Sequence, residues 1–270
     1  MKHLVAVLHI GELLLEKLGS RKRYISKTET IQKISYYYFS HSYHLGFSIY
    51  HLTKIGYDSA AIILTRTLLE MLIDFSYLWL CKDINGIHTD EREAWMRYDA
   101  VRREGIETKW DQMQDYRINN GLPVVEPMKI FNQEVSDLIN DQKIEFKNKF
   151  NRRHWALFES LDKRARAVDK TNKLSTIDFE KTYVLSYKWS SELVHGESAS
   201  ANVYMSFDVD SGLNIDFGPT GKKSSLAISM SAHFLSEVFY LVNHLNNLGI
   251  NIQKQFECYN LNFSTEENFV

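Results

Sequence analysis

Cysteine, proline and glycine are scarce in this 270-residue sequence, and each shortage narrows the range of folds. The two cysteines, Cys81 and Cys258, form neither a CxxC pair nor a disulfide framework, so a reducing, cytoplasmic setting is expected. Three prolines and 12 glycines leave little material for long irregular linkers. Apolar residues make up 44% and charged residues 24%, as in ordinary globular proteins. A globular, largely helical protein is therefore expected.

Strong charge of either sign and the common catalytic signatures are also missing. The formal net charge is −2, so the whole chain has no general attraction to nucleic acid or to an acidic membrane. The sequence contains no Walker-type phosphate loop, GxGxxG, GxSxG or HExxH. We expect no cofactor and no metal, and any nucleic-acid partner would have to use a local basic patch.

One long apolar run, residues 60–80, has three charges inside it. It is about as long as a membrane span, but Arg66, Glu70 and Asp74 occur at intervals of four residues. Each charge would cost roughly 2.5–3.5 kcal/mol near the centre of a bilayer. The run is therefore predicted to be a buried helix with a polar stripe, and no membrane partner is expected.

Helical periodicity recurs along most of the chain. The predicted fold class is mainly α: a multi-helix bundle with a small β-hairpin inserted before the last long helix. The hairpin is expected within residues 203–217, where apolar and polar residues alternate on both sides of a turn at Gly212. An amphipathic helix is expected at the N-terminus, and the other helices are predicted at residues 28–52, 58–81, 89–113, 128–150, 155–168, 175–195 and 224–248.

The domain organisation follows from the linkers. The clearest one, residues 119–127, has two of the three prolines and a glycine. We expect a single helical domain over residues 1–255, with a soft division near 119–127. Residues 256–270 are expected to form a loosely held tail.

Two polar rows have the spacing of one helix face. Arg66, Glu70 and Asp74 form the first, and Tyr187, Ser191 and His195 form the second. Two structural explanations remain open: an internal Arg66–Glu70 ion pair, and a histidine that suits the dipole of a helix C-terminus. The alternative is that the two rows meet in one functional cleft.

The segments GYDSAAIILTRTLLE and YKWSSELVHG resemble a bacterial domain-of-unknown-function family. Its members share an R-x-x-x-E helix and a later Y-x-x-x-S-x-x-V-H segment, and the likeness covers about residues 30–250. A more distant resemblance is to HEPN domains, helical bundles of bacterial conflict systems whose ribonucleases have R-x(4–6)-H on a late helix. This chain has Lys188 where that motif has arginine, with six residues between it and His195.

The HEPN resemblance implies metal-independent RNA cleavage of the toxin or phage-defence type. In that mechanism His195 transfers a proton at the attacking 2′-hydroxyl or at the leaving oxygen. Arg66 or Lys188 holds the scissile phosphate, Glu70 orients Arg66, and Tyr187 donates a hydrogen bond.

A basic segment between residues 143 and 173 gives RNA binding modest support. It has ten Lys and Arg against four acidic residues. Arg152 and Arg153 precede Trp155, a combination suited to backbone contacts and base stacking, although a solvated helix face is the simpler explanation. The predicted substrate-binding residues are Arg152, Arg153, Lys163, Arg164 and Arg166.

A metal site and a protein-interaction module compete with RNA cleavage as functions. Glu192 and His195 have the ExxH spacing of di-iron bundles, and His41 and His44 are three residues apart. A di-iron site needs two ExxH pairs and two further carboxylates, so a metal site is not expected. The main alternative to an enzyme is a non-catalytic helical module that binds a protein partner or forms a homodimer.

Overall fold

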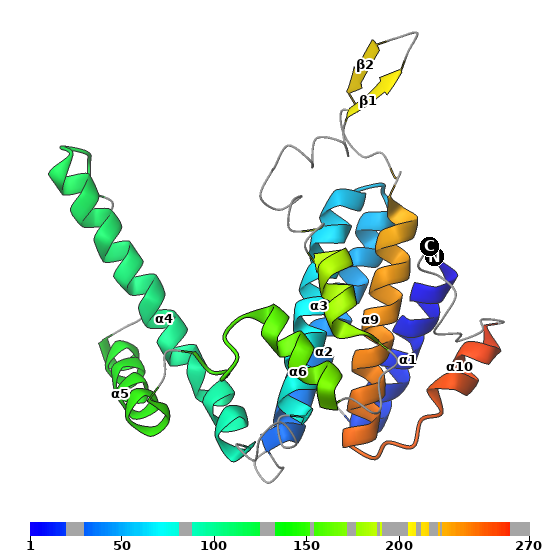
Figure 1. Cartoon of the computed structure of the whole chain (residues 1–270), viewed down its shortest axis with the longest axis horizontal. Helices are drawn as coiled ribbons and strands as arrows, with labels where there is room; N and C mark the ends of the chain where they lie inside the picture. Colours follow the sequence, from blue (N-terminus) through cyan, green and yellow to red (C-terminus); the bar gives the residue numbers. More distant parts are fainter. Residues whose placement is uncertain are drawn as a thin grey trace. The chain divides into compact units, whose positions relative to one another are not determined.

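The protein is a mainly helical chain that divides into two compact units (Figure 1). The computed structural model describes residues 1–19, 30–80, 88–124, 133–151, 154–171, 177–187, 190, 205–208, 212–215, 221 and 223–259. Unit 1 consists of Met1–Leu80 and Ser160–Val270, and unit 2 consists of Cys81–Glu159. The helical part of the predicted fold class is therefore confirmed.

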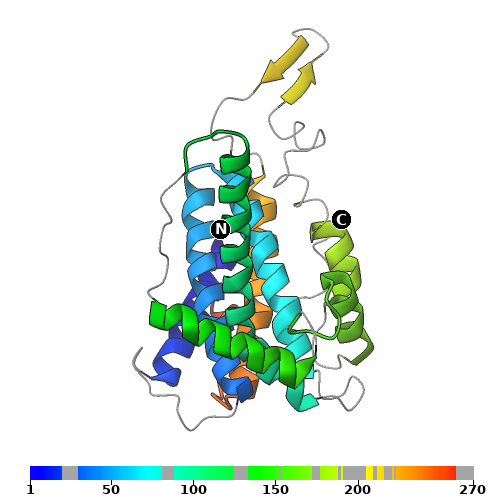
Figure 2. The same cartoon turned by 90° about the vertical axis from the view of Figure 1, so that its left-hand side faces the viewer.

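Four long helices form the core of unit 1. They are α1 (Lys2–Leu18), α2 (Thr30–Lys54), α3 (Asp58–Leu80) and α9 (Ser224–Leu245). Helices α2, α3 and α9 contact one another, and α1 contacts α2 and α9, so the four lie side by side (Figures 1 and 2). The apolar run predicted to be buried is α3, and most of its apolar side chains are buried.

A turn and a hydrogen bond connect these helices. Gly56, with φ +82°, ends α2, and the Tyr57 N–H donates to the Leu52 carbonyl at 2.9 Å. The buried carboxylate of Asp58 at the start of α3 accepts a 2.6 Å bond from the Lys223 N–H, which ties α3 to the beginning of α9. The predicted break at Gly56 is thus confirmed, and it produces an antiparallel helical hairpin.

Glycines allow the core helices to approach closely. A Cβ at Gly11 of α1 would lie 2.5 Å from the Tyr43 ring and 2.9 Å from the Phe239 ring. A Cβ at Gly46 of α2 would lie 2.6 Å from Leu235. Side chains from α2 and α9 therefore occupy the space that larger residues on α1 and α2 would need.

Among the described residues, α9 is the helix long and apolar enough to cross a membrane by length and composition. Within its most apolar window, 72% is buried inside the unit. A single helix of this kind is weak evidence for a membrane span, because buried core helices have the same length and composition.

Three shorter segments pack on α3 or on one another. They are α6 (Leu161–Thr171), α7 (Phe179–Thr182) and a π-helical turn, η2 (Tyr183–Tyr187). Helix α6 and η2 both contact α3, and α7 joins α6 to η2. Asp178 caps α7 by accepting from the Lys181 N–H at 2.8 Å. This layer packs on the face of α3 that has the polar stripe and leaves Glu70 partly exposed.

Unit 2 is a second helical hairpin, formed by α4 (His88–Asn119) and α5 (Gln133–Phe150). Ion pairs connect the two helices: Arg97 bonds Glu93 and Glu145, and Lys149 donates to Glu93 at 2.6 Å. The predicted soft division at residues 119–127 lies inside this unit, between α4 and α5, whereas the boundaries between units fall after Leu80 and after Glu159.

The segment predicted as one helix over residues 155–168 crosses the second of these boundaries. Trp155 is buried in unit 2, and the Leu157 N–H donates to Glu91 at 2.6 Å. Residues 154–158 are bends for this reason, and α6 begins only at Leu161.

The predicted fold class must be corrected in its β component. Among the residues that the structure describes, strands β1 (Met205–Asp208) and β2 (Gly212–Ile215) pair only with each other, over four residues each. An isolated two-stranded ladder of this length is marginal in water and adds no layer to the bundle. Gly212, expected in the turn, instead pairs with Asp208. The fold is helical, without an inserted sheet layer.

The expected tail also needs correction at its start. Residues 256–258 belong to α10 (Ile252–Cys258), which packs on α1. Phe256 is 3% exposed, and Asn251 caps the helix by accepting from the Lys254 N–H at 2.9 Å. Residues 260–270 lie outside the described part of the chain.

Candidate functional site

The polar stripe of α3 faces the layer formed by α6 and η2. Arg66 and Glu70 lie toward η2, and Asp74 lies against α6. The stripe exists because charged residues recur every four positions on a helix that is otherwise buried, and such charges need polar partners. Those partners come from segments about 90 and 121 residues further along the chain.

Arg66 is the centre of the cluster. Its Nη2 lies 3.1 Å from Glu70 Oε1 and donates to the Tyr187 hydroxyl at 2.6 Å. Its Cζ is 4.4 Å from the centroid of the Tyr187 ring, within cation–π range. The buried Nε has no hydrogen-bond partner among the described residues. The guanidinium is thus fixed by a carboxylate and a phenol while part of its donor capacity remains unused.

The cluster opens to solvent at Glu70. The side chain of Arg66 is 17% exposed and that of Glu70 is 36% exposed. A ligand that reached the guanidinium would therefore approach past the carboxylate. Removing that carboxylate would leave Arg66 with Tyr187 as its remaining polar partner in the described structure.

Two stacked tyrosines form the η2 side of the cluster. The rings of Tyr183 and Tyr187 are 4.7 Å apart and inclined by 20°. Burial raises the pKa of Tyr183, and the neighbouring Tyr187 and Asp162 add to the increase. Both rings belong to a π-helical turn, a feature often found at functional sites. The turn places the Tyr187 hydroxyl on Arg66.

Asp74 and Arg164 form a more deeply buried pair next to Arg66 and Glu70. Arg164 Nε donates to Asp74 Oδ1 at 2.7 Å, and the arginine side chain is only 8% exposed. Burial raises the pKa of Asp74 to about 6; Arg164 opposes this rise, and the negative charge of Glu70 adds to it. This pair anchors α6 on α3 and offers no free cation to a substrate.

Of the predicted catalytic residues, the structure brings Arg66, Glu70 and Tyr187 together. His195 and Lys188, which complete the predicted set, lie outside the described residues.

The Asp74–Arg164 contact is not among the contacts predicted from the sequence. A signal was present, since a charge in the stripe of a buried helix needs a partner and α6 is strongly amphipathic.

The predicted substrate-binding residues have different surroundings. Arg164 is buried and donates to Asp74, and its role in substrate binding stays a prediction. Arg166 donates to Glu180 at 2.8 Å, and Lys163 is exposed. Arg152 and Arg153 lie outside the described residues.

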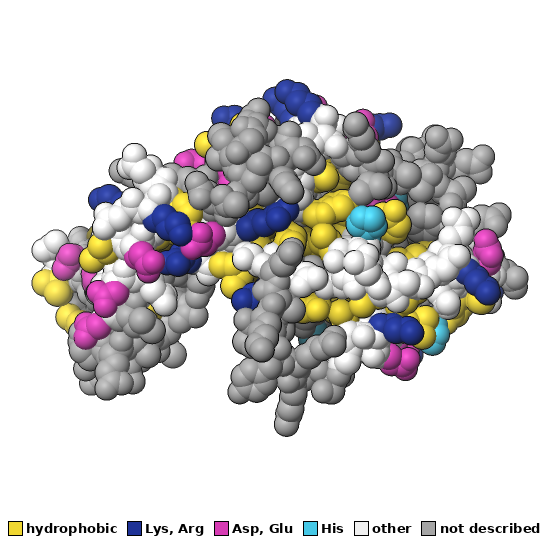
Figure 3. All heavy atoms as spheres, turned by 90° about the horizontal axis from the view of Figure 1, so that it is seen from below, with side chains coloured by type: hydrophobic (Ala, Val, Ile, Leu, Met, Phe, Trp, Pro, Cys, Tyr) yellow, Lys and Arg dark blue, Asp and Glu magenta, His cyan; other side chains and the backbone are white. Residues whose placement is uncertain are grey.

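The basic segment is divided between the two units of the described structure. Its parts belong to different units, and Trp155, predicted to stack on bases, is 5% exposed. On the face of unit 2 drawn in Figure 3, acidic and basic side chains are mixed, consistent with the ion pairs of α4 and α5. Mixed charges of this kind are typical of a solvated helix surface.

No group of three or more metal-ligating side chains occurs among the residues that the structure describes. His41 and His44, considered as a possible pair, each bond to their own helix. His44 Nδ1 donates to the Ser40 carbonyl at 2.7 Å, and His41 Nδ1 lies 3.3 Å from the Tyr37 hydroxyl. Glu192, like His195, lies outside the described residues.

Residues 28–213 match a family described as a family of unknown function (DUF5677). The matched region includes α2, α3 and the whole Arg66–Glu70–Tyr187 cluster. No curated protein and no solved structure matches the chain.

Proposed function

Because this chain belongs to the DUF5677 family of unknown function, whose matched region contains the Arg66 cluster, we propose a function from the chemistry of that cluster. The protein is a HEPN-like, metal-independent endoribonuclease of the toxin or phage-defence type that acts in the cytoplasm. The observation that carries this proposal is the contact of the Arg66 guanidinium with Glu70 and Tyr187 at a solvent-accessible edge.

Arg66 binds the scissile phosphate. A guanidinium presents a planar set of donors that matches phosphate oxygens, and here only Nη2 is used by Glu70 and Tyr187. The carboxylate and the phenol hold the guanidinium in one orientation, so little further ordering is needed when the phosphate arrives. Glu70 and Tyr187 are therefore positioning residues.

His195 transfers the proton in the proposed reaction. The 2′-hydroxyl attacks the adjacent phosphorus and the 5′-oxygen leaves, which yields a 2′,3′-cyclic phosphate and a 5′-hydroxyl. One proton must leave the 2′-oxygen and one must reach the 5′-oxygen, and imidazole does either near neutral pH. Lys188 supplies a second positive charge to the phosphate in this scheme. Both assignments rest on the sequence.

RNA outside the reacting phosphate is held by exposed basic side chains. Lys163 on α6 is exposed on the same unit as Arg66, and Arg152 and Arg153 remain sequence-based candidates. Arg166 contributes less, because Glu180 already accepts from it. Contacts of this type predict RNA binding that weakens as salt is added.

The test is cleavage of end-labelled single-stranded RNA in excess EDTA, with identification of the product ends. We expect cyclic phosphate products from the wild-type protein and at least a hundredfold slower cleavage by His195→Ala. The control variant His3→Gln alters an exposed histidine of α1 and should retain full activity. Full activity of a folded His195→Ala protein, or no cleavage by the wild type, would refute the proposal.

A non-catalytic interaction module is the second candidate, and one surface favours it. Four apolar side chains are 44–63% exposed at the end of α4 and in the following turn: Tyr116, Ile118, Leu122 and Val124. Exposed apolar groups in one stretch are typical of a contact surface. This candidate predicts a homodimer that becomes monomeric in an Ile118→Asp and Val124→Asp protein, as measured by sedimentation velocity. Unchanged sedimentation would reject this surface.

A further inference from the structure

The charges of the α3 stripe and of its partner on α6 balance one another. Arg66 Nη2 lies 3.1 Å from Glu70 Oε1, within hydrogen-bonding distance. Beside this pair, Arg164 Nε donates to Asp74 Oδ1 at 2.7 Å. Burial raises the pKa of Asp74 to about 6, so at about pH 8 this carboxyl is ionised and the two pairs together have no net charge. An anion that binds Arg66 therefore meets a site without excess positive charge.

The Arg66 guanidinium and the Tyr187 hydroxyl still have donors for one anion. Nη2 makes the contacts with Glu70 and Tyr187, and Nε is buried, so the two N–H groups of Nη1 have no partner among the described residues. The Tyr187 oxygen accepts from Nη2, which leaves its own O–H group to donate to a ligand. One charged and one neutral donor group suit the non-bridging oxygens of a phosphate.

Glu70 lies beside the path to these donors. Its side chain is 36% exposed and that of Arg66 is 17% exposed, so the carboxylate is the more accessible member of the pair. A second negative charge on the ligand is attracted by Arg66 and repelled by Glu70 at similar distances, and the two effects largely cancel. Because the cost of desolvation rises with the square of the charge, a dianion loses more than a monoanion on entering this site.

The neighbouring charges of α6 and α7 do not add a cation to this edge. Arg166 lies 2.8 Å from Glu180 and 3.9 Å from Asp162, so two acidic groups oppose its charge. Burial raises the pKa of Tyr183, and the carboxylates of Asp162 and Glu70 add to the rise. Two carboxylates are therefore close enough to act on the tyrosine that stacks on Tyr187.

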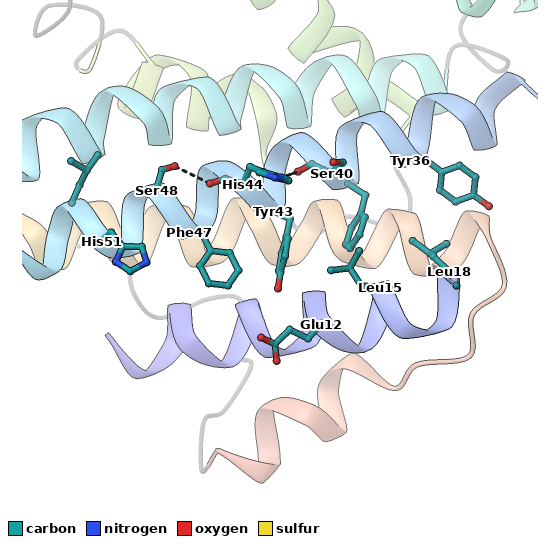
Figure 4. Close-up of a pocket in the computed structure, with 13 residues that line it drawn as sticks. Glu12, Leu15, Leu18, Tyr36, Ser40, Tyr43, His44, Phe47, Ser48 and His51 are labelled. Atoms are coloured by element: carbon teal, nitrogen blue, oxygen red, sulfur yellow. Dashed lines mark hydrogen bonds between the residues drawn. The ribbon is translucent and has the colours of Figure 1, made fainter. Parts of the chain in front are cut away.

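A groove between α1 and α2 does not compete for phosphate (Figure 4). The described residues that line this groove include no arginine or lysine. They do include Glu12, whose carboxylate lies 3.2 Å from His9 Nδ1 and repels anions. A phosphate probe is therefore expected at Arg66 rather than in this groove.

We propose that Glu70 makes Arg66 selective for phosphate groups with a single negative charge, the class that includes the phosphodiesters within an RNA strand. This inference rests on the proposed function, because it specifies which phosphates of RNA the site accepts. A terminal phosphate has a second ionisation near pH 6 and is a dianion at about pH 8. The protein therefore acts within strands, and terminal phosphates and free mononucleotides compete poorly for Arg66.

The test uses two ligands that differ by one charge: 2′-deoxyuridine 3′-phosphate and its methyl ester. Neither has a 2′-hydroxyl, so neither is cleaved, and their binding is measured independently of the proposed reaction. The full chain is titrated calorimetrically with each ligand at about pH 8 and constant salt. We expect the wild type to bind the ester at least as tightly as the dianion, and Arg66→Gln to lose both.

Glu70→Gln is the variant that isolates the charge. Glutamine keeps an oxygen that accepts from Nη2 but removes the carboxylate. We expect the affinity for the dianion, relative to that for the ester, to rise about tenfold or more. The matched control Glu16→Gln removes an exposed negative charge from α1 and should leave this ratio unchanged.

The outcomes separate this inference from the proposed reaction. An unchanged ratio in a Glu70→Gln protein shown by circular dichroism to be folded, or no saturable binding of the ester by the wild type, would overturn the inference. If that wild type still cleaves RNA, the proposed reaction stands and only the role of Glu70 is rejected. A shifted ratio in a protein that does not cleave RNA would refute the reaction and support selective phosphodiester binding.

Discussion

Arg66 shows what a tertiary contact adds to a helical ion pair. In the Arg-before-Glu order, an i,i+4 pair is the weaker arrangement and contributes little by itself. The Tyr187 hydroxyl, 121 positions further along the chain, supplies a charge-assisted bond of 2.6 Å to the same nitrogen. Spacing along α3 predicts the Arg66–Glu70 pair, and the second polar row predicts Tyr187. Spacing does not predict which N–H groups of Arg66 remain for a ligand, because that depends on three-dimensional packing.

Removing one oxygen atom tests the Arg66–Tyr187 contact. In Tyr187→Phe the ring remains over the guanidinium, but the acceptor of the Nη2 bond is lost. We expect the free energy of unfolding to fall by about 1–2 kcal/mol, because a bond to a charged, partly buried group is removed. Urea denaturation measures this change. The control Tyr183→Phe, which keeps the Tyr187 hydroxyl, should lose less, and an equal loss would argue against the contact.

The raised pKa of Asp74 predicts that stability falls as the pH rises, which is the opposite of the usual effect of a carboxylate. Burial raises its pKa to about 6 in the folded protein from 3.8 in the unfolded chain. The folded state therefore binds the proton more tightly, so the contribution to stability is present below pH 4 and is lost as the pH rises through 6. The loss is up to about 3 kcal/mol.

Asp74→Asn should remove that dependence. The difference in unfolding free energy between wild type and variant is measured by urea denaturation at intervals from pH 4 to pH 7. We expect the difference to change across this window in favour of the variant, and Glu16→Gln, at an exposed position, to show no such trend. A pH-independent difference for Asp74→Asn would contradict the raised pKa.

At the scale of elements, long amphipathic helices were predictable and short segments defined by tertiary contacts were not. Periodicity identified α2, α3 and α9 because each has a continuous apolar face of at least 22 residues. The α7–η2 segment was predicted as one regular helix. It is held by bonds from another element, since Asp169 of α6 accepts from the Phe179 and Glu180 N–H groups at 2.8 and 2.7 Å. Local sequence does not encode that constraint.

Close packing of α1 on α2 and α9 can be tested at Gly11. An added methyl group would lie 2.5 Å from the buried Tyr43 ring, so Gly11→Ala forces one element to shift. Overpacking costs about 1–3 kcal/mol, and the higher helix propensity of alanine offsets about 1 kcal/mol. We expect a net loss of up to about 2 kcal/mol in thermal or urea unfolding. Ser229→Ala on the exposed face of α9 should not destabilise. A Gly11→Ala protein at least as stable as wild type would contradict this packing.

At the scale of the whole molecule, helical class was predictable from composition, but the division into units was not. The proline-containing linker at residues 119–127 is the strongest local signal, yet it joins two helices of the same unit. The boundary after Glu159 lies within a charged segment that reads as continuous helix. Trp155 and Val168 are both buried, yet Trp155 belongs to unit 2 and Val168 to unit 1. Burial partners of this kind cannot be read from spacing.

Cleavage of a labelled single-stranded RNA in EDTA by wild type and by Arg66→Gln is the most direct test of the proposed function. The glutamine side chain retains donors near Glu70 and Tyr187 but removes the positive charge proposed to bind the scissile phosphate. We expect wild-type cleavage and a loss of at least about a hundredfold in the folded variant, corresponding to about 2.7 kcal/mol of transition-state stabilisation. Equal cleavage rates for the two proteins, with the variant's fold confirmed by circular dichroism, would contradict a catalytic role for Arg66.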